Sequence, residues 1–152
     1  MGHEMLNMSD YFLFDRIREG MGDREAIRSD LGSLTYADVA AQASGMGSRL
    51  RHLGVERGQR VLISLPDGAG YVATLFGVLG IGAVAVMINP ELRPDHLAAI
   101  LDRARAPVAV VAPDHLEGLD AASAVSQHPP DPLILDPGAI EPGDVTFATA
   151  AT

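Results

Sequence analysis

The chain has 152 residues, of which 47% are hydrophobic, so it is long and apolar enough to form one globular domain. Its net charge is −9, and this balance argues against binding to nucleic acid or to anionic membrane surfaces. The sequence has no cysteine, which excludes a disulfide framework, a thiolate zinc site and a cysteine nucleophile.

The cellular compartment of the protein is suggested by its lack of cysteine and by its first residues. A chain without cysteine fits the reducing cytoplasm, and residues 1–12 lack the basic stretch and apolar run of a signal peptide. We therefore expect a cytoplasmic protein.

The first expected elements are short. Ser9 is suited to cap a helix that runs to about Glu19, where Gly20 occupies the stop position. Residues 26–29 are expected to form a short strand.

A longer amphipathic helix follows. Thr35 is a typical helix N-cap, and Asp38 stands three residues later, where a capping box usually has glutamate. Apolar residues then recur at helical spacing until Gly54, which closes the helix.

The rest of the chain alternates strands with helices. Short apolar runs predict strands at 61–65, 83–88, 108–111 and 133–135. Between them we expect helices at 70–79, from Pro94 onward, and a short helix that Pro113 and Asp114 open. This alternation predicts an α/β fold, a mainly parallel β-sheet with helices on both faces. The first three of these strands should be neighbours in the sheet.

One segment could also be read as a membrane span, because residues 68–89 contain no charged residue. The segment contains five glycines and is flanked by Asp67 and Glu91, without a positive side. We therefore favour a buried helix, a glycine turn and a strand.

The composition changes towards the end of the chain. Residues 106–152 contain seven acidic residues and no basic residue, and five prolines fall between positions 129 and 142. We therefore divide the chain into an α/β subdomain at 1–128 and a Pro-rich, acidic connecting segment at 129–152.

The glycine clusters do not match a nucleotide-binding motif. Gly45 and Gly47 fall inside a helix, and Gly77, Gly80 and Gly82 precede a strand instead of following one. Close helix packing is therefore the favoured interpretation. A phosphate-binding P-loop of the G-x-x-x-x-G-K-[ST] type is excluded, since the sequence has no lysine.

The histidines and carboxylates form no recognisable catalytic pattern. His96 with Asp102, or His115 with Asp114, could belong to a hydrolytic triad, but no serine occupies a G-x-S-x-G elbow. No two histidines have the i, i+4 spacing of a helical zinc motif. We interpret all five histidines, and the Asp114–Glu117 pair, as surface residues. The sequence thus assigns no catalytic, cofactor-binding or metal-binding residue.

Four segments nevertheless resemble motifs of one enzyme family. Residues 34–39, LTYADV, resemble L-[TS]-Y-x-E-L, and residues 55–65, VERGQRVLISL, resemble GV-x-x-G-D-R-V-A-I-x-L with Gln59 in place of Asp. The third segment, residues 77–90, resembles G-x-L-K-A-G-A-V-x-V-P-L-N-P. The fourth, residues 94–111, resembles P-E-E-L-x-Y-I-L-x-x-S-x-A-x-V-L-V. In this order and spacing they identify an adenylate-forming (AMP-binding) acyl- or aryl-CoA ligase. The opening, from Asn7 to Ile27, is similar to benzoate-CoA ligase-like members.

The resemblance implies a reaction and its cofactors. In this family an acid reacts with ATP to give an acyl-adenylate, and a thiol, commonly CoA, then accepts the acyl group. That chemistry requires a glycine-rich phosphate loop, magnesium and a lysine. Residues 144–147 resemble the strand that leads into this loop, and the family's later motifs have no counterpart here. ATP, magnesium and CoA are thus implied for a complete enzyme, with no cofactor site in this chain.

Three hypotheses follow. The chain is a scaffold-forming N-terminal fragment of a ligase, inactive alone, or a free-standing, non-catalytic relic that binds a partner protein. An unrelated small α/β ligand-binding domain is the third. In the first two cases we expect an exposed apolar face, to which residues 71–88 contribute. This face would pack against the remaining ligase segment or mediate self-association.

Overall fold

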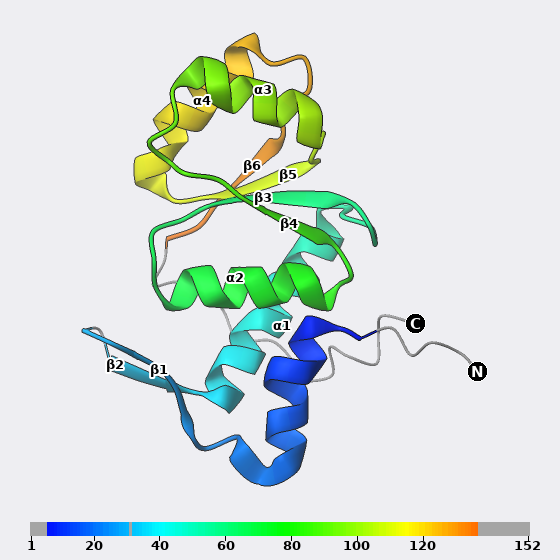
Figure 1. The fold of residues 1–152 in the computed structure, drawn as a ribbon, viewed down its shortest axis with the longest axis vertical. Helices are drawn as coiled ribbons and strands as arrows, with labels where there is room; N and C mark the ends of the chain where they lie inside the picture. The colour runs from blue at the N-terminus through cyan, green and yellow to red at the C-terminus, as the bar shows by residue number, and fades with distance from the viewer. Residues whose placement is uncertain (1–5, 31, 137–152) are drawn as a thin grey trace.

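A computed structural model describes residues 6–30 and 32–136 (Figure 1). Its centre is a four-stranded sheet with helices on both faces. Helices α1 and α2 cover one face, and α3 and α4 cover the other. The amino-terminal helical segment and a small β-hairpin lie beyond α1 and α2. The predicted α/β class with a parallel sheet is confirmed.

The central sheet has the strand order β4-β3-β5-β6, and every neighbouring pair is parallel. Its strands are β3 (Arg60–Ser64), β4 (Val84–Met87), β5 (Val108–Val111) and β6 (Asp131–Ile134). The expected adjacency of the first three strands is therefore confirmed. The segment at 68–89 is a helix followed by a strand, as favoured above. No helix of the described residues is both long and apolar enough to cross a membrane.

Alternation along the strands divides the core into two clusters. Val61 and Ile63 of β3 pack with α1 and α2, whereas Leu62 packs with α3 and α4. All three side chains are fully buried. The sheet is thus apolar on both faces, as parallel sheets usually are.

Helix α1 (Tyr36–His52) begins as the sequence predicts. The Thr35 side chain accepts a hydrogen bond from the Asp38 backbone, and the Asp38 carboxylate accepts one from the Thr35 N–H at 2.9 Å. Both halves of the capping box are present. Gly54, at φ +86°, follows the last turn in a left-handed conformation that suits glycine.

Helix α2 (Ala69–Gly80) crosses α1 at very short range. A Cβ placed on Gly77 would lie 2.9 Å from Met46 Cβ and 3.0 Å from the Ala43 carbonyl oxygen. Gly77 therefore allows the two helices to approach closely, which confirms the packing interpretation at this glycine.

On the opposite face lie α3 (Pro94–Ala104) and α4 (Leu116–Val125), the second preceded by the 3₁₀ turn η3 (Pro113–His115). The predicted short helix at Pro113 is therefore only the start of a longer helical segment. Leu101 and Ala122, one from each helix, are fully buried in the cluster against the sheet.

The amino-terminal segment contains two wide helical turns, η1 (Asp10–Phe14) and η2 (Ile17–Met21). The expectation that Ser9 caps this helix is wrong. Its hydroxyl instead donates to the Phe76 carbonyl oxygen of α2 at 2.5 Å, while the Asn7 side chain accepts from the Ser9 N–H at 2.9 Å. Ser9 is buried and ties the segment to α2, a contact between distant parts of the chain that local pattern could not reveal.

The hairpin consists of β1 (Glu25–Ser29) and β2 (Gly32–Thr35), which pair antiparallel. The first strand was expected and the second was not. Residues 144–147, with their expected strand, lie outside the described residues. The boundary between 128 and 129 stays a prediction, although β6 falls within the second segment and pairs with β5.

Substitution of Gly77 tests the close helix approach. Gly77→Ala should reduce the free energy of unfolding by about 1–3 kcal/mol, because the new methyl group overlaps Met46 and the Ala43 carbonyl. Gly118→Ala in α4 is the matched control, since a Cβ there meets no atom within 4 Å. The control should be neutral or stabilising by about 0.5–1 kcal/mol. Urea denaturation measures both, and equal effects would contradict the packing role.

Candidate functional site

The topology indicates where a ligand site could form. The chain visits β3, then β4 on one side, then β5 and β6 on the other, so the connection reverses direction between β3 and β5. Ligands of open α/β sheets usually bind at the carboxyl ends of the strands at such a switch point. The residues that follow β3 and β5 therefore form the candidate site.

Two polar side chains meet there. His115, from η3, is half-buried, and its Nδ1 lies 2.9 Å from the Ser64 carbonyl oxygen and 3.3 Å from Ser64 Oγ. Ser64 is the last residue of β3 and is 3% exposed. The interpretation of His115 as a simple surface residue needs correction, because it bonds to a strand 51 positions away.

The geometry opposes a nucleophilic role for Ser64. A carbonyl oxygen only accepts hydrogen bonds, so Nδ1 must carry the hydrogen that it donates to Ser64 O. The same nitrogen then cannot remove a proton from the Ser64 hydroxyl. The Ala112 N–H also donates to this carbonyl, at 3.0 Å. These hydrogen bonds to Ser64 from His115 and Ala112 hold the loop after β5 against the end of β3. We call this contact the latch.

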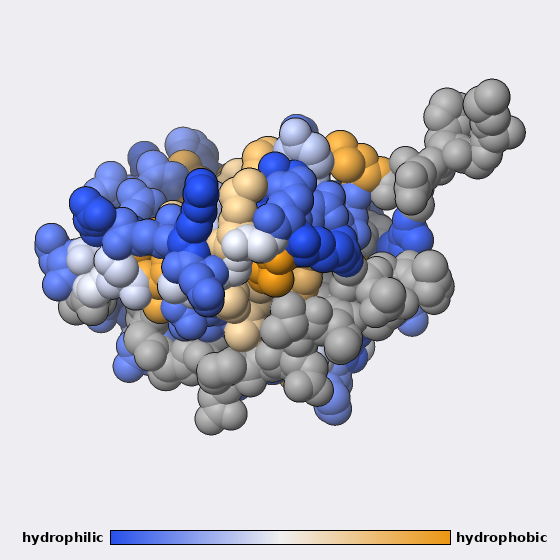
Figure 2. Space-filling model, turned by 90° about the horizontal axis from the view of Figure 1, so that it is seen from below, coloured by the Kyte–Doolittle hydropathy of each residue, from blue (hydrophilic) through white to orange (hydrophobic). Residues whose placement is uncertain are grey.

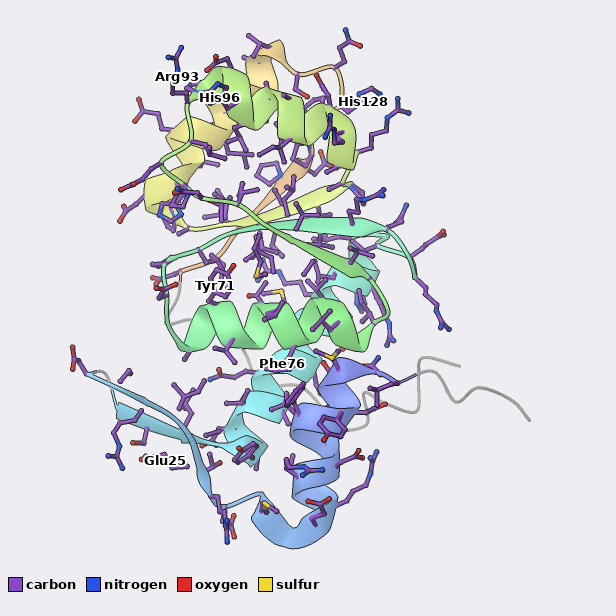
Figure 3. All side chains as sticks on the ribbon, in the orientation of Figure 1. Glu25, Tyr71, Phe76, Arg93, His96 and His128 are labelled. Carbon is purple, nitrogen blue, oxygen red and sulfur yellow. The ribbon has the colours of Figure 1, made fainter. Side chains whose placement is uncertain are left out.

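The start of α2 borders the same site. Gly68 precedes the helix at φ +155° and supplies no side-chain cap. One turn along, burial and, to a smaller extent, the Asp67 carboxylate raise the pKa of the Tyr71 phenol above its ordinary value. Tyr71, in the first part of α2 and labelled in Figure 3, therefore remains a neutral hydroxyl at physiological pH.

The histidine and aspartate of α3 considered as a catalytic pair do not meet. His96 lies near the start of α3, where its Nε2 is 3.9 Å from an Asp95 oxygen. Asp102 lies in the last part of the helix, beside His128, whose Nδ1 is 3.6 Å from Asp102 Oδ1 (Figure 3). Among residues 6–30 and 32–136, no catalytic triad forms at either end of α3.

Asp102 instead organises the loop before β6. Its Oδ1 accepts hydrogen bonds from Ser126 Oγ at 2.6 Å, Gln127 N at 2.8 Å and His128 N at 3.1 Å. The Ser126 bond foremost, followed by the two backbone bonds and the His128 charge, lowers the pKa of the Asp102 carboxyl despite some desolvation. Sequence reasoning missed this cluster, because its members lie 24–26 positions apart.

Charge differs between the two ends of the sheet. Arginines precede the amino ends of the strands, and several occupy the last turns of α1 and α3, where cations complement the helix dipole. They are Arg49, Arg51, Arg57, Arg60, Arg103 and Arg105. Acidic residues follow the carboxyl ends, among them Asp67, Glu91 and Asp114. Helix stabilisation accounts for part of this pattern.

Two features of the described residues bear on the cofactors that the resemblance implies. Within this part of the chain, no group of three histidine or acidic residues is arranged to hold a metal ion. The Ser64–His115 pair is engaged in its latch, and the sequence offers no lysine to neutralise phosphate. The described residues therefore offer no arrangement from which a reaction step through ATP, magnesium or CoA could be derived.

Comparison with known proteins defines the class. The model of the family described as AMP-binding enzyme matches residues 14–151. The chain therefore belongs to this family, which confirms the resemblance found in the sequence.

Among curated relatives, 3-hydroxybenzoate–CoA ligase of Aromatoleum sp. (strain CIB) is 32% identical over 64% of this chain and 18% of its own length. The 3-hydroxybenzoate–CoA/4-hydroxybenzoate–CoA ligase of Thauera aromatica is 26% identical over 95% of this chain and 28% of its own length. The chain thus spans less than a third of these relatives.

Solved structures agree with this assignment. A benzoate CoA ligase from Burkholderia xenovorans LB400 superposes with a TM-score of 0.79 and 26% identity, over 89% of this chain and 27% of that one. An anthranilate CoA ligase in complex with anthranoyl-AMP gives 0.78 and 26%, over 90% of this chain and 26% of that one. The fold is that of the corresponding part of these enzymes.

The latch can be tested by mutation. His115→Ala should reduce the free energy of unfolding by about 0.5–1.5 kcal/mol, because it removes a half-buried hydrogen bond to Ser64. His96→Ala is the control, since that side chain is 66% exposed and should change stability by less than about 0.5 kcal/mol. Equal urea midpoints for the two variants would refute the latch.

The Asp102 cluster predicts a dependence on pH. A carboxyl whose pKa is lower in the folded state stabilises the fold above its unfolded pKa, about 3.9, and loses this effect as pH falls. The stability difference between the wild type and Asp102→Asn should therefore shrink between pH 6 and pH 3. Thermal unfolding across this range measures it, with Asp120→Asn, an exposed carboxylate on α4, as control. A difference that stays constant with pH would exclude the carboxylate as its source.

Proposed function

We propose that the chain is the scaffold-forming N-terminal segment of an ATP-dependent acyl- or aryl-CoA ligase and is not catalytic alone. The main support for this proposal is the extent of the alignment: 95% of this chain aligns with only 28% of the length of a hydroxybenzoate–CoA ligase. The sheet and its helices would support the remainder of the enzyme, which would bind ATP, magnesium and CoA. Benzoate- and anthranilate-type relatives favour an aromatic acid as the substrate of the complete enzyme.

There is a chemical reason to propose that this chain supplies the scaffold and the rest of the enzyme supplies the catalytic groups. Formation of an acyl-adenylate from a carboxylate and ATP places negative charge on the departing pyrophosphate, which lysine and magnesium normally stabilise. The sequence contains no lysine, and the described residues at the switch point are occupied by a structural contact. We therefore propose a cytoplasmic scaffold whose partner is the remaining ligase segment, with no role in binding nucleic acid or membranes.

A second function is favoured by the surface. Large apolar side chains stand 46–58% exposed on several elements, including Tyr11, Phe12, Val84 and Met87. Seen from the side of the hairpin and the amino-terminal helix, apolar areas lie among hydrophilic ones (Figure 2). Such side chains suit a free-standing protein-interaction module, in which the same surface would bind a partner or a second copy.

The scaffold proposal predicts inactivity of the isolated chain. It should show no acid-dependent ATP–pyrophosphate exchange with benzoate, 3-hydroxybenzoate or anthranilate, because loss of even one charge-stabilising donor costs about 10²–10³ in rate. A complete benzoate-CoA ligase serves as positive control. Exchange by protein purified free of host ligases would contradict the proposal.

A chimera separates the two functions. When this chain replaces the matching segment of the Thauera aromatica hydroxybenzoate ligase, a scaffold should preserve measurable thioester formation. An interaction module that has lost its ligase contacts should give a folded but inactive chimera.

A further inference from the structure

Strand β4 forms an edge of the parallel sheet. It pairs with β3 on one side and, within the described residues, with no strand on the other. Its two end residues are largely exposed, Val84 at 46% and Met87 at 58%. An edge strand in this state offers both backbone groups and apolar side chains to another strand.

The backbone has a defined direction. Val84 N donates to Gln59 O at 2.8 Å and Ile88 N to Ile63 O at 3.1 Å, both towards β3. Because backbone direction alternates along a strand, Ala85 and Met87 direct their N–H and C=O groups away from β3. These residues supply the free hydrogen-bonding groups of the edge.

The two edges of the sheet differ in protection. On the opposite edge, β6 carries the charge of Asp131 and the ring of Pro132, two features that discourage further strand pairing. Strand β4 has neither charge nor proline and is made of Val, Ala, Val and Met. The unprotected edge is therefore β4.

Charges at the ends of β4 suit an antiparallel partner. Arg57 lies over Gly82 at the amino end, since a Cβ on Gly82 would be 2.9 Å from Arg57 Cγ. Glu91 is exposed shortly after the carboxyl end. When two copies of β4 run antiparallel, the basic end of one lies beside the acidic end of the other.

We propose that β4 pairs antiparallel with β4 of a second copy and so joins the two central sheets into one continuous sheet. The backbone N–H and C=O of Ala85 in one copy form hydrogen bonds with those of Met87 in the other copy, and Met87 of the first copy does the same with Ala85 of the second. This register places the two copies of Val86 opposite each other on the two-fold axis. Small Ala85 faces large Met87, and the contact is isologous and closed. This pairing goes beyond the proposed ligase function, because it concerns how two copies of the chain associate.

A cysteine at the axis tests the register. Opposed residues of a non-hydrogen-bonded antiparallel pair have Cα atoms about 4.5 Å apart, within disulfide range. Since the chain has no cysteine, Val86→Cys should give a covalent dimer under mild oxidation. Ile134→Cys on the β6 edge, 48% exposed in the wild type, is the control and should cross-link at least ten times more slowly. Equal rates would overturn the register.

Blocking the edge tests the dimer itself. Light scattering should give the wild-type chain twice its 16.0 kDa mass at micromolar concentration. Ala85→Pro removes an outward N–H without touching the bonds to β3, and Met87→Lys brings a charge to the edge. Both should be monomers, whereas Ile134→Lys should remain dimeric. Circular dichroism confirms folding, and Met87→Lys decides the matter if Ala85→Pro unfolds.

Two results would overturn the proposal: a monomeric wild type, or dimers that survive both β4 substitutions. Co-expression with the remaining segment of a related ligase supplies a third test. If the Val86→Cys variant no longer cross-links in that complex, the edge belongs to the ligase remainder instead of a second copy. The ATP–pyrophosphate exchange assay is independent of this outcome, so failure of either idea can be recognised separately.

Discussion

The central strand β3 has no side that faces water, and this constraint shapes the rest of the molecule. It has β4 and β5 as neighbours, and Val61, Leu62 and Ile63 are completely buried. A strand of this kind forms only when helices cover both faces of its sheet. The two helix layers, and the two separate apolar clusters that they build, follow from this requirement.

The two layers are attached to the sheet by different means. On one face, the absence of a side chain at Gly77 lets α2 lie against Met46 of α1, so that the contact depends on shape. On the other face, polar contacts fix the connections: His115 bonds to Ser64, and Asp102 gathers the loop before β6. Hydrogen bonds are directional, so the second layer is held in position by a few side chains.

Much of the fold could be predicted because its signals are local. The strand at 108–111 is a run of four apolar residues, and the Thr35–Asp38 box begins α1 as expected. The strand β2, GSLT, lacks both alternation and a β-branched run, and it forms because β1 pairs with it. Helix α4 was underestimated because Gly118 weakens its local signal.

Neither the contact that anchors the amino-terminal segment nor that of the candidate site could be predicted, since each joins residues distant in sequence. Ser9 meets Phe76 across 67 positions, and His115 meets Ser64 across 51. A serine before a helix usually caps it, and a lone histidine is usually on the surface. Tertiary packing gave both side chains other partners, which pattern and propensity do not describe.

The family resemblance and the absence of assigned chemistry have one physical explanation. The four matching segments coincide with the cap of α1, the entry and length of β3, the turn from α2 into β4, and the passage from α3 into β5. Each position answers a backbone or packing demand, such as the left-handed conformation of Gly82 at φ +75°. These demands recur in any protein that builds this sheet, whatever reaction it supports. The polar groups at the switch point serve the fold, and under the proposed scaffold function the side chains for ligase chemistry would come from the rest of the enzyme.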